Sequence, residues 1–387
     1  MTSRAAFSST NFGGRMPSEA RILRFPERAS GRRSPGDVLA IATDYLSQDV
    51  EERKALDVES TYRDLDVLLS ICGALRERVN SNPSEVLAEA GRIFAWVTQQ
   101  GRSLGYFDER DFFLGESALL AGSACRLLGE NADAELWLDR ADASYRHTIN
   151  PTPSLTRVAY ARLSLRYDMG RYKDVLELLP SVALTFEKLA LHAELGKCHL
   201  LEASSLKELG RTSDAAARLQ VMLSSPELAS QTALRGMAML SLGNIRSQEG
   251  DQEQALAAYR AAQPLLESSE RYSTLADLKG LVAEMLRQLG QISAAVDAYR
   301  ESVNDHVKLG MQTRAAYMRV VLSEALLEAG RPREAEWEIL AALPTINEQK
   351  MVPEGFAAVV LLQESVRQRK TDPQALSELR QYLQTSS

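Results

Sequence analysis

A glycine recurs at an almost fixed interval of forty residues through most of the chain. Six segments carry it: LLGENADAELWLDRA, DMGRYKDVLELLPSV, ELGRTSDAAARLQVM, QEGDQEQALAAYRAA, QLGQISAAVDAYRES and EAGRPREAEWEILAA. The intervals are 41, 40, 40, 40 and 40 residues, and the glycines are Gly129, Gly170, Gly210, Gly250, Gly290 and Gly330. With only 22 glycines in the chain, chance does not explain this spacing. Such a period is typical of arrays of structural repeats.

Apolar residues keep fixed distances from each of these glycines. Five residues after the glycine stands a mostly small residue: Ala134, Val175, Ala215, Ala255, Ala295 and Ala335. Nine residues after it stands a larger one: Leu138, Leu179, Leu219, Tyr259, Tyr299 and Ile339. Seven residues before it the chain has Gly122, Leu163, Ala203, Gly243, Ala283 and Ser323. Because residues four apart lie on one helix face, we predict two antiparallel helices per unit, in contact at these residues.

The glycine is expected at the corner between these two helices. A glycine just past a helix adopts the left-handed conformation without steric cost. Asp251 before Gln254, and Pro332 in a first turn, are typical of a helix start. A phosphate-binding loop is excluded, because neither GxxxxGK[ST] nor GxGxxG follows a strand pattern.

The pattern resembles the tetratricopeptide repeat, most clearly at Gly243, Gly250, Ala255, Tyr259 and Ala262. The resemblance covers about residues 103 to 345. It departs from the family in its longer period, in Val182, Met222 and Ser302 at the last small position, and in having a helix-ending proline, Pro180, in only some units. It implies an all-α fold, a right-handed α-solenoid of antiparallel helix pairs. The chain is also similar to bacterial proteins that join a helical leader to such an array, and this similarity implies no defined activity.

The chain outside the array divides into shorter parts. We predict a disordered basic tail over 1–33, a helical leader over 34–57, a degenerate first helix pair over 58–102, six regular repeats over 103–345 and capping helices over 346–387. Asn82, Pro83 and Glu85 form a capping pattern for a helix, and 101–111 is expected to be a turn. Helices are also expected near Glu51 and over 372–384. The tail is either solvated or docks through Ile22, Leu23 and Phe25, on a partner or in the protein's own groove.

The distribution of charge limits the function. Residues 1–33 carry +5, so the remaining residues carry -12 of the net charge of -7. An acidic body disfavours direct nucleic-acid binding, which depends on Lys and Arg. No stretch approaches the length of a membrane span. Three distant cysteines, Cys72, Cys125 and Cys198, favour buried thiols in a reducing compartment, and we expect the cytoplasm.

Few residues suggest chemistry. His192, Cys198 and His199 cluster on one predicted helix, but they offer at most two or three zinc ligands without a fourth. No nucleophile elbow or cysteine-protease motif is present, and the many carboxylates are typical of solvated helix faces. We therefore expect no catalytic activity, metal or cofactor.

The first helices are expected to form a concave binding groove, as the resemblance implies. Its inward positions lie thirteen, ten, six and three residues before each glycine, and the candidate contacts are Arg157, Tyr160, Ser164, Lys197, Ser204, Lys207, Asn244, Arg287 and Tyr317. Arg157, Lys197 and Lys207 favour an acidic segment. We predict a scaffold that binds a partner peptide or helix. The alternative is a peptide-sensing regulator of signalling or transcription that acts through a protein partner and whose N-terminal helices, residues 34 to 79, move in response.

Overall fold

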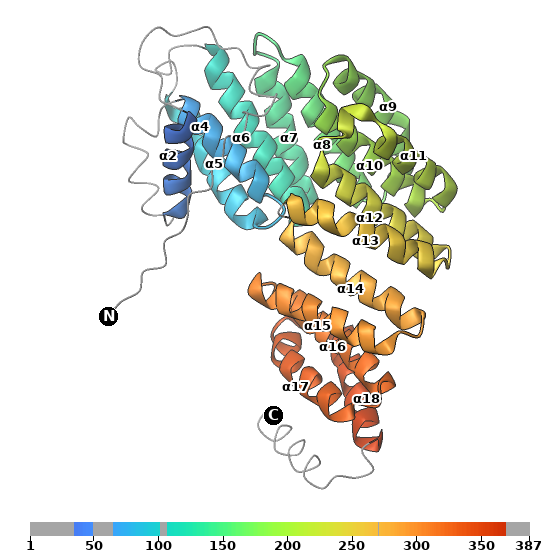
Figure 1. Cartoon of the computed structure of the whole chain (residues 1–387). Helices are drawn as coiled ribbons and strands as arrows, with labels where there is room; N and C mark the ends of the chain where they lie inside the picture. Colours follow the sequence, from blue (N-terminus) through green and yellow to red (C-terminus); the bar gives the residue numbers. More distant parts are fainter. Residues whose placement is uncertain (1–34, 49–64, 101–106, 270, 369–387) are drawn as a thin grey trace. The chain divides into compact units, whose positions relative to one another are not determined.

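The computed structural model describes residues 35–48, 65–100, 107–269 and 271–368 (Figure 1). Within these ranges every regular element is helical and none is a strand, so the all-α expectation is confirmed. The chain divides into two compact units, which are described separately. The first comprises Met1–Leu165 with Lys188–Leu191, and the second comprises Arg166–Glu187 with His192–Ser387.

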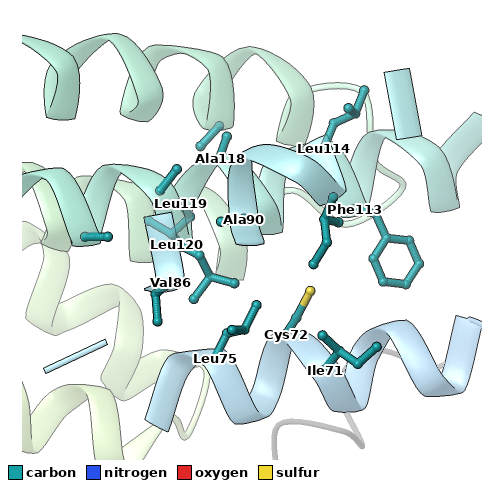
Figure 2. Packing of buried hydrophobic residues seen from close by; sticks show 14 of the residues in the cluster. Ile71, Cys72, Leu75, Val86, Ala90, Phe113, Leu114, Ala118, Leu119 and Leu120 are labelled. Atoms are coloured by element: carbon teal, nitrogen blue, oxygen red, sulfur yellow. The ribbon is translucent and has the colours of Figure 1, made fainter. Parts of the chain in front are cut away.

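The first unit is built around one hydrophobic core. Its helices are α2 (Pro35–Ser47), α4 (Leu65–Arg78), α5 (Pro83–Gln100), α6 (Phe107–Leu127), α7 (Asn131–Tyr145) and most of α8 (Thr152–Asp168). Figure 2 shows Ile71, Cys72 and Leu75 of α4 facing side chains of α5 and α6, and all three are at most 1% exposed. The helices α2, α4 and α5 therefore share their core with the first regular repeat.

The second unit stacks helix pairs in chain order. Its elements are α9 (Tyr172–Lys188), α10 (His192–Glu208), α11 (Thr212–Ser224), a 3-10 helix η2 (Pro226–Leu228), α12 (Thr232–Gln248), α13 (Gln252–Ser268), α14 (Tyr272–Gln288), α15 (Ile292–Lys308), α16 (Gln312–Glu328), α17 (Pro332–Glu348) and α18 (Val352–Gln368). Each second helix from α11 onward also contacts the first helix of the next pair. The result is the expected tetratricopeptide-like array of helix pairs.

Helix and turn lengths explain the period. Most helices of the array have 17 residues and are followed by a turn of three, as in α12 and α13. Two such steps give forty residues. The helix α11 has only 13 residues, but η2 and its flanking turns restore the register before α12.

The repeat glycines lie at the corner between the two helices, as predicted. All six have positive φ, between 69° and 79°. At Gly250 the following amide, of Asp251, donates to the carbonyl of Arg246 at 2.9 Å, so the turn satisfies a helix-end carbonyl.

The predicted contact between paired helices is also confirmed. The residues five and nine positions after each glycine are at most 1% exposed. A β-carbon placed on Gly243 would lie 2.3 Å from the ring of Tyr259. The aromatic ring therefore occupies the space that the missing side chain leaves.

Two local expectations are wrong, and others lie outside the described residues. Pro180 does not end a helix but lies inside α9, where its exposed position lets the helix continue. The helix α6 begins at Phe107, within the segment 101–111 that was expected to be a turn.

The predicted helix cap at Asn82 is confirmed, because Asn82 Oδ1 accepts from the amide of Glu85 at 3.4 Å. The tail 1–33, the helix near Glu51 and the helix over 372–384 fall outside the described ranges.

Candidate binding face on the first helices

One repeat position is exposed on three of four successive first helices of the second unit and half-buried on the fourth, at Asp277. It lies thirteen residues before each repeat glycine, and we call its residues the first-helix row: Lys197, Met237, Asp277 and Tyr317. The exposed fractions are 46% for the Lys197 side chain, 40% for Met237, 39% for the Asp277 side chain and 46% for Tyr317. The residue that follows Lys197, Met237 or Asp277 is at most 1% exposed. Each of these three helices therefore turns one side chain into the core and the preceding one toward solvent.

Several predicted contacts of the second unit, Lys197 among them, make hydrogen bonds or ion pairs within the protein. Lys197 Nζ lies 3.8 Å from Oε1 of Glu194 on the same helix. Lys207 Nζ lies 3.0 Å from Glu208 Oε1. The Asn244 side-chain oxygen accepts from the hydroxyl of Tyr259 at 2.8 Å. The half-buried Ser204 is a hydrogen-bond partner of Tyr167. These residues therefore also stabilise the face on which a partner would bind.

Arg287 lies among three carboxylates. Its guanidinium donates to Glu284 at 3.1 Å and to Glu328 at 2.7 Å, and Glu324 lies 3.9 Å away. Burial raises the pKa of Glu324, assisted by the negative charges of Glu284 and Glu328 and opposed by Arg287. Tyr299 also donates to Glu284, at 2.6 Å. Arg287 thus connects α14 to α16 as part of a charged cluster.

The row residue Asp277 is fixed by two neighbouring helices. Its Oδ1 lies 2.9 Å from Nε2 of the fully buried His306 of α15, and its Oδ2 pairs with Arg314 of α16. The other ring nitrogen of His306 lies 2.8 Å from the carbonyl oxygen of Ser302. These contacts hold the carboxylate of Asp277 in one orientation on the row.

The first unit pairs its corresponding positions with one another. Arg157, thirteen residues before Gly170, donates both terminal nitrogens to Glu116, each at 3.2 Å. Glu116, thirteen residues before Gly129, also pairs with Arg76 of α4 and accepts from the hydroxyl of Tyr145 at 2.8 Å. Its side chain is only 1% exposed. Glu116 therefore joins α4, α6, α7 and α8.

The electrostatics of Glu116 follow from its partners. Burial by itself would raise the pKa of Glu116, but the positive charges of Arg157 and Arg76 outweigh burial and hold this pKa well below the ordinary carboxyl range. Burial and the charge of Glu116 raise the pKa of Tyr145 well above its usual value, so the hydroxyl stays protonated and donates. The site is a buried carboxylate with two arginine partners.

The remaining predicted residues of the first unit lie on α8. Tyr160 is half-buried, and its carbonyl oxygen accepts from the Ser164 hydroxyl at 3.1 Å. Ser164 therefore bonds its own helix through this hydroxyl. Because the two units are described separately, these residues and the first-helix row are treated as two surfaces.

Sequence reasoning identified Arg157 but missed Glu116, Arg76 and the glutamates around Arg287. A pattern could have revealed them. Arg76 and Glu116 are 40 residues apart, and Glu116 and Arg157 are 41 apart, which is one repeat in each case. Arg287 and Glu328 are 41 apart and lie one position from equivalence, three residues before Gly290 and two before Gly330. Opposite charges separated by one repeat occupy equivalent positions on neighbouring first helices, and there they pair.

The cluster of His192, Cys198 and His199 shows no metal-binding arrangement. Among the described residues, no group of three or more His, Cys, Asp or Glu side chains is placed to hold a metal ion. Burial, then the charge of Arg218, lowers the pKa of His199, and burial raises the pKa of the Cys198 thiol to about 12. Over the same described ranges, no helix is both long and apolar enough for a membrane span.

Comparison with known proteins yields structural relatives only. No protein-family model and no curated protein matches the sequence. A Rap protein complexed with competence and sporulation factor is similar to it, with 11% identity and a TM-score of 0.51 over 87% of this chain and 99% of that chain. Aspartyl phosphate phosphatase F from Bacillus subtilis is similar with 13% identity and a TM-score of 0.51, over 89% and 96% of the two chains.

A third similar structure is the Rap conjugation gene regulator of the plasmid pLS20 in complex with the Phr* peptide. It is 16% identical, with a TM-score of 0.50 over 87% of this chain and 94% of that chain. Identities this low carry the fold and not the activity. Together with the forty-residue repeat and its glycine corners, they show that this protein has the tetratricopeptide-type helical-repeat fold.

Proposed function

We propose that this protein is a non-catalytic binding scaffold that holds a segment of a partner protein or peptide along the first-helix row of its second unit. One observation carries this proposal. Lys197, Met237, Asp277 and Tyr317 all remain 39% to 46% exposed at the same repeat position. A row that combines a cation, a thioether, a carboxylate and a phenol offers both apolar and charged contacts.

The spacing of the row suits an extended segment. A segment that crosses the first helices would meet one row residue on each helix. An extended chain advances about 3.3 Å per residue, so several of its residues would separate consecutive contacts. Its side chains between these contacts would remain free for other interactions.

The row also suggests the chemistry of the segment. The Lys197 side chain, 46% exposed beside Glu194, presents an ammonium group to a carboxylate, which supports the expectation of an acidic segment. Met237 and Tyr317 favour apolar side chains, and tyrosine is frequent among residues that dominate binding energy. Asp277, held by His306 and Arg314, favours a hydrogen-bond donor.

Affinity capture from a lysate of the source organism, with mass spectrometry, tests this function. The full chain is compared with a variant that carries Lys197→Glu and Tyr317→Ala. We expect a specific partner to be captured by the wild type and depleted by at least about tenfold with the variant, because both changes remove exposed contacts from the row. Circular dichroism should be unchanged, since neither side chain is buried.

A matched variant carries Lys173→Glu and Tyr272→Ala, which alter an exposed lysine and an exposed tyrosine of the second unit outside the row. This control should capture the partner as well as the wild type does. Equal loss with both variants, or retention of every partner by the row variant, would remove the row from consideration.

A second candidate function is a peptide-sensing regulator that acts through a protein partner. The observation that favours it is the bonding of α4, one of the N-terminal helices, to α8 through Glu116. Two of the similar structures contain a bound factor or peptide, and one of them is named a gene regulator. This function requires that binding alters α4. The rate of alkylation of Cys72 in α4, measured with and without the captured partner, should then differ, and equal rates would contradict it.

We place this activity in the cytoplasm, without direct nucleic-acid binding. Cys72, Cys125 and Cys198 are all buried free thiols, which suits a reducing compartment. The acidic body of the chain disfavours contact with phosphate backbones.

A further inference from the structure

Glu116 bonds both the N-terminal helix α4 and the predicted binding residue of α8. Its Oε1 pairs with Arg76 of α4, and both of its oxygens accept from Arg157 of α8. The hydroxyl of Tyr145 completes the set at 2.8 Å. Three elements other than its own helix therefore depend on the position of one carboxylate.

The exposure of these groups is unequal. The Glu116 side chain is 1% exposed, whereas that of Arg157 is 20% exposed and that of Arg76 is 33% exposed. An incoming carboxylate can therefore reach the guanidinium of Arg157 more easily than it can reach Glu116. A buried ion loses much of its hydration, so removal of one partner leaves it poorly compensated.

Arg76 links Glu116 to α4, a helix that also packs into the core of the first unit. The same helix carries Ile71, Cys72 and Leu75, which Figure 2 shows packed toward α5 and α6. The Cys72 thiol is 1% exposed and lies one helical turn before Arg76. Its accessibility to a thiol reagent therefore reports whether α4 stays docked.

We propose that Glu116 is a positioning residue that couples Arg157 on α8 to the docking of the N-terminal helix α4, an inference that rests on the second proposed function. When Arg157 turns to an acidic group of a partner, Glu116 loses its bidentate donor. The contact between α4 and α6 then weakens, and α4 undocks more often. Binding of a partner at Arg157 would therefore change how firmly α4 packs against α6, in addition to holding the partner.

Thiol labelling of the full chain tests this coupling without any partner. Wild type, Arg157→Gln and Arg162→Gln are treated with iodoacetamide, and each cysteine is quantified by peptide mass spectrometry over time. Arg162 is the matched control, because it lies on the same helix but pairs with Asp139 of α7 at 2.6 Å. Cys198, in the second unit, reports any general loss of structure.

We expect Arg157→Gln to accelerate labelling of Cys72 by at least about tenfold, because a buried charge pair loses one partner. Arg162→Gln should stay within about twofold of the wild type, because exposed pairs contribute little. Labelling of Cys198 should not change. Arg157 lowers the pKa of Cys72, so its loss would by itself slow labelling, and an acceleration must come from exposure of the thiol.

The role of Glu116 is separated by a double variant. With Glu116→Gln already present, adding Arg157→Gln should change Cys72 labelling by less than about twofold, because the two changes remove the same interaction. Arg157→Lys keeps the charge but loses the bidentate geometry, so the rate of Cys72 labelling should lie between those of the wild type and Arg157→Gln. This variant tests the coupling even if Glu116→Gln does not fold.

Three results would overturn the proposal: equal rates for Arg157→Gln and Arg162→Gln, an undiminished effect of Arg157→Gln beside Glu116→Gln, or a parallel rise in Cys198 labelling. None of them depends on a partner. Failure of the coupling is therefore distinct from failure of capture by the first-helix row.

Discussion

At the scale of single residues, the repeat places equivalent positions of neighbouring helices in contact. Charged residues then pair across one period, as Arg76 and Arg157 do with Glu116. Where the equivalent residues do not pair with each other, as for Lys197, Met237 and Tyr317, the side chains stay exposed. The residue type at one repeat position therefore decides whether neighbouring helices form an ion pair there or leave their side chains exposed to solvent.

The contact between Gly243 and Tyr259 gives a stability prediction. We expect Gly243→Ala to lower the free energy of unfolding by about 1–3 kcal/mol, because the new methyl group would lie 2.3 Å from the aromatic ring. The greater helix propensity of alanine offsets only about 1 kcal/mol of this cost. Thermal unfolding followed by circular dichroism measures the change.

Gly91→Ala is the matched control. Gly91 lies inside α5, and no neighbouring side chain stands within 4 Å of the place that a β-carbon would take there. This substitution should stabilise the protein by up to about 1 kcal/mol through helix propensity alone. If Gly243→Ala were also stabilising, the predicted close contact between α12 and α13 would be wrong.

At the scale of elements, a helix of 17 residues and a turn of three form the half-period. Seven glycines take the left-handed conformation in these turns, but Ala190 and Lys350 adopt it too, with φ of 54° and 52°. Ala190 follows Gly170 by twenty residues, and Lys350 follows Gly330 by twenty. The geometry of the turn, and not the presence of glycine, thus imposes the left-handed backbone conformation at these positions.

Lys350→Gly should therefore stabilise the protein. A residue with a β-carbon loses about 1–2 kcal/mol in the left-handed conformation, so we expect a gain of about 1 kcal/mol in the free energy of unfolding. Lys308→Gly is the control, because Lys308 is an exposed lysine that ends α15 in helical conformation. It should be neutral or destabilising by up to about 1 kcal/mol. Equal effects in chemical denaturation would contradict this account of the turn.

The sequence was sufficient for the helix pairs because glycine corners and small residues are local and repeated. Gly250, Ala255 and Tyr259 each have the predicted place. The left-handed turns at Ala190 and Lys350 were not predictable, since neither residue type favours them. Pro180 within α9 shows the reverse error, because proline normally interrupts a helix but is tolerated here on the exposed side.

At the scale of the whole molecule, the sequence predicted which repeat positions form the candidate face. It did not predict whether the side chains at these positions pair within the protein or stay exposed. The repeat register identifies Arg157 and Lys197 as equivalent. It does not show that Arg157 bonds a buried glutamate while Lys197 is 46% exposed. That difference depends on which residue the adjacent helix supplies, and therefore on pairing between positions about forty residues apart.

The central claim is that the first-helix row of the second unit contacts a partner. The most direct measurement is site-specific photo-cross-linking in a lysate of the source organism, with Tyr317→p-benzoylphenylalanine on the row and Tyr272→p-benzoylphenylalanine outside it. Both tyrosines are exposed residues of first helices, at 46% and 54%. We expect a discrete cross-linked partner from position 317, lost when Lys197→Glu is added, and none from position 272. The same adduct from both positions, or an adduct at 317 that is indifferent to Lys197→Glu, would contradict this claim.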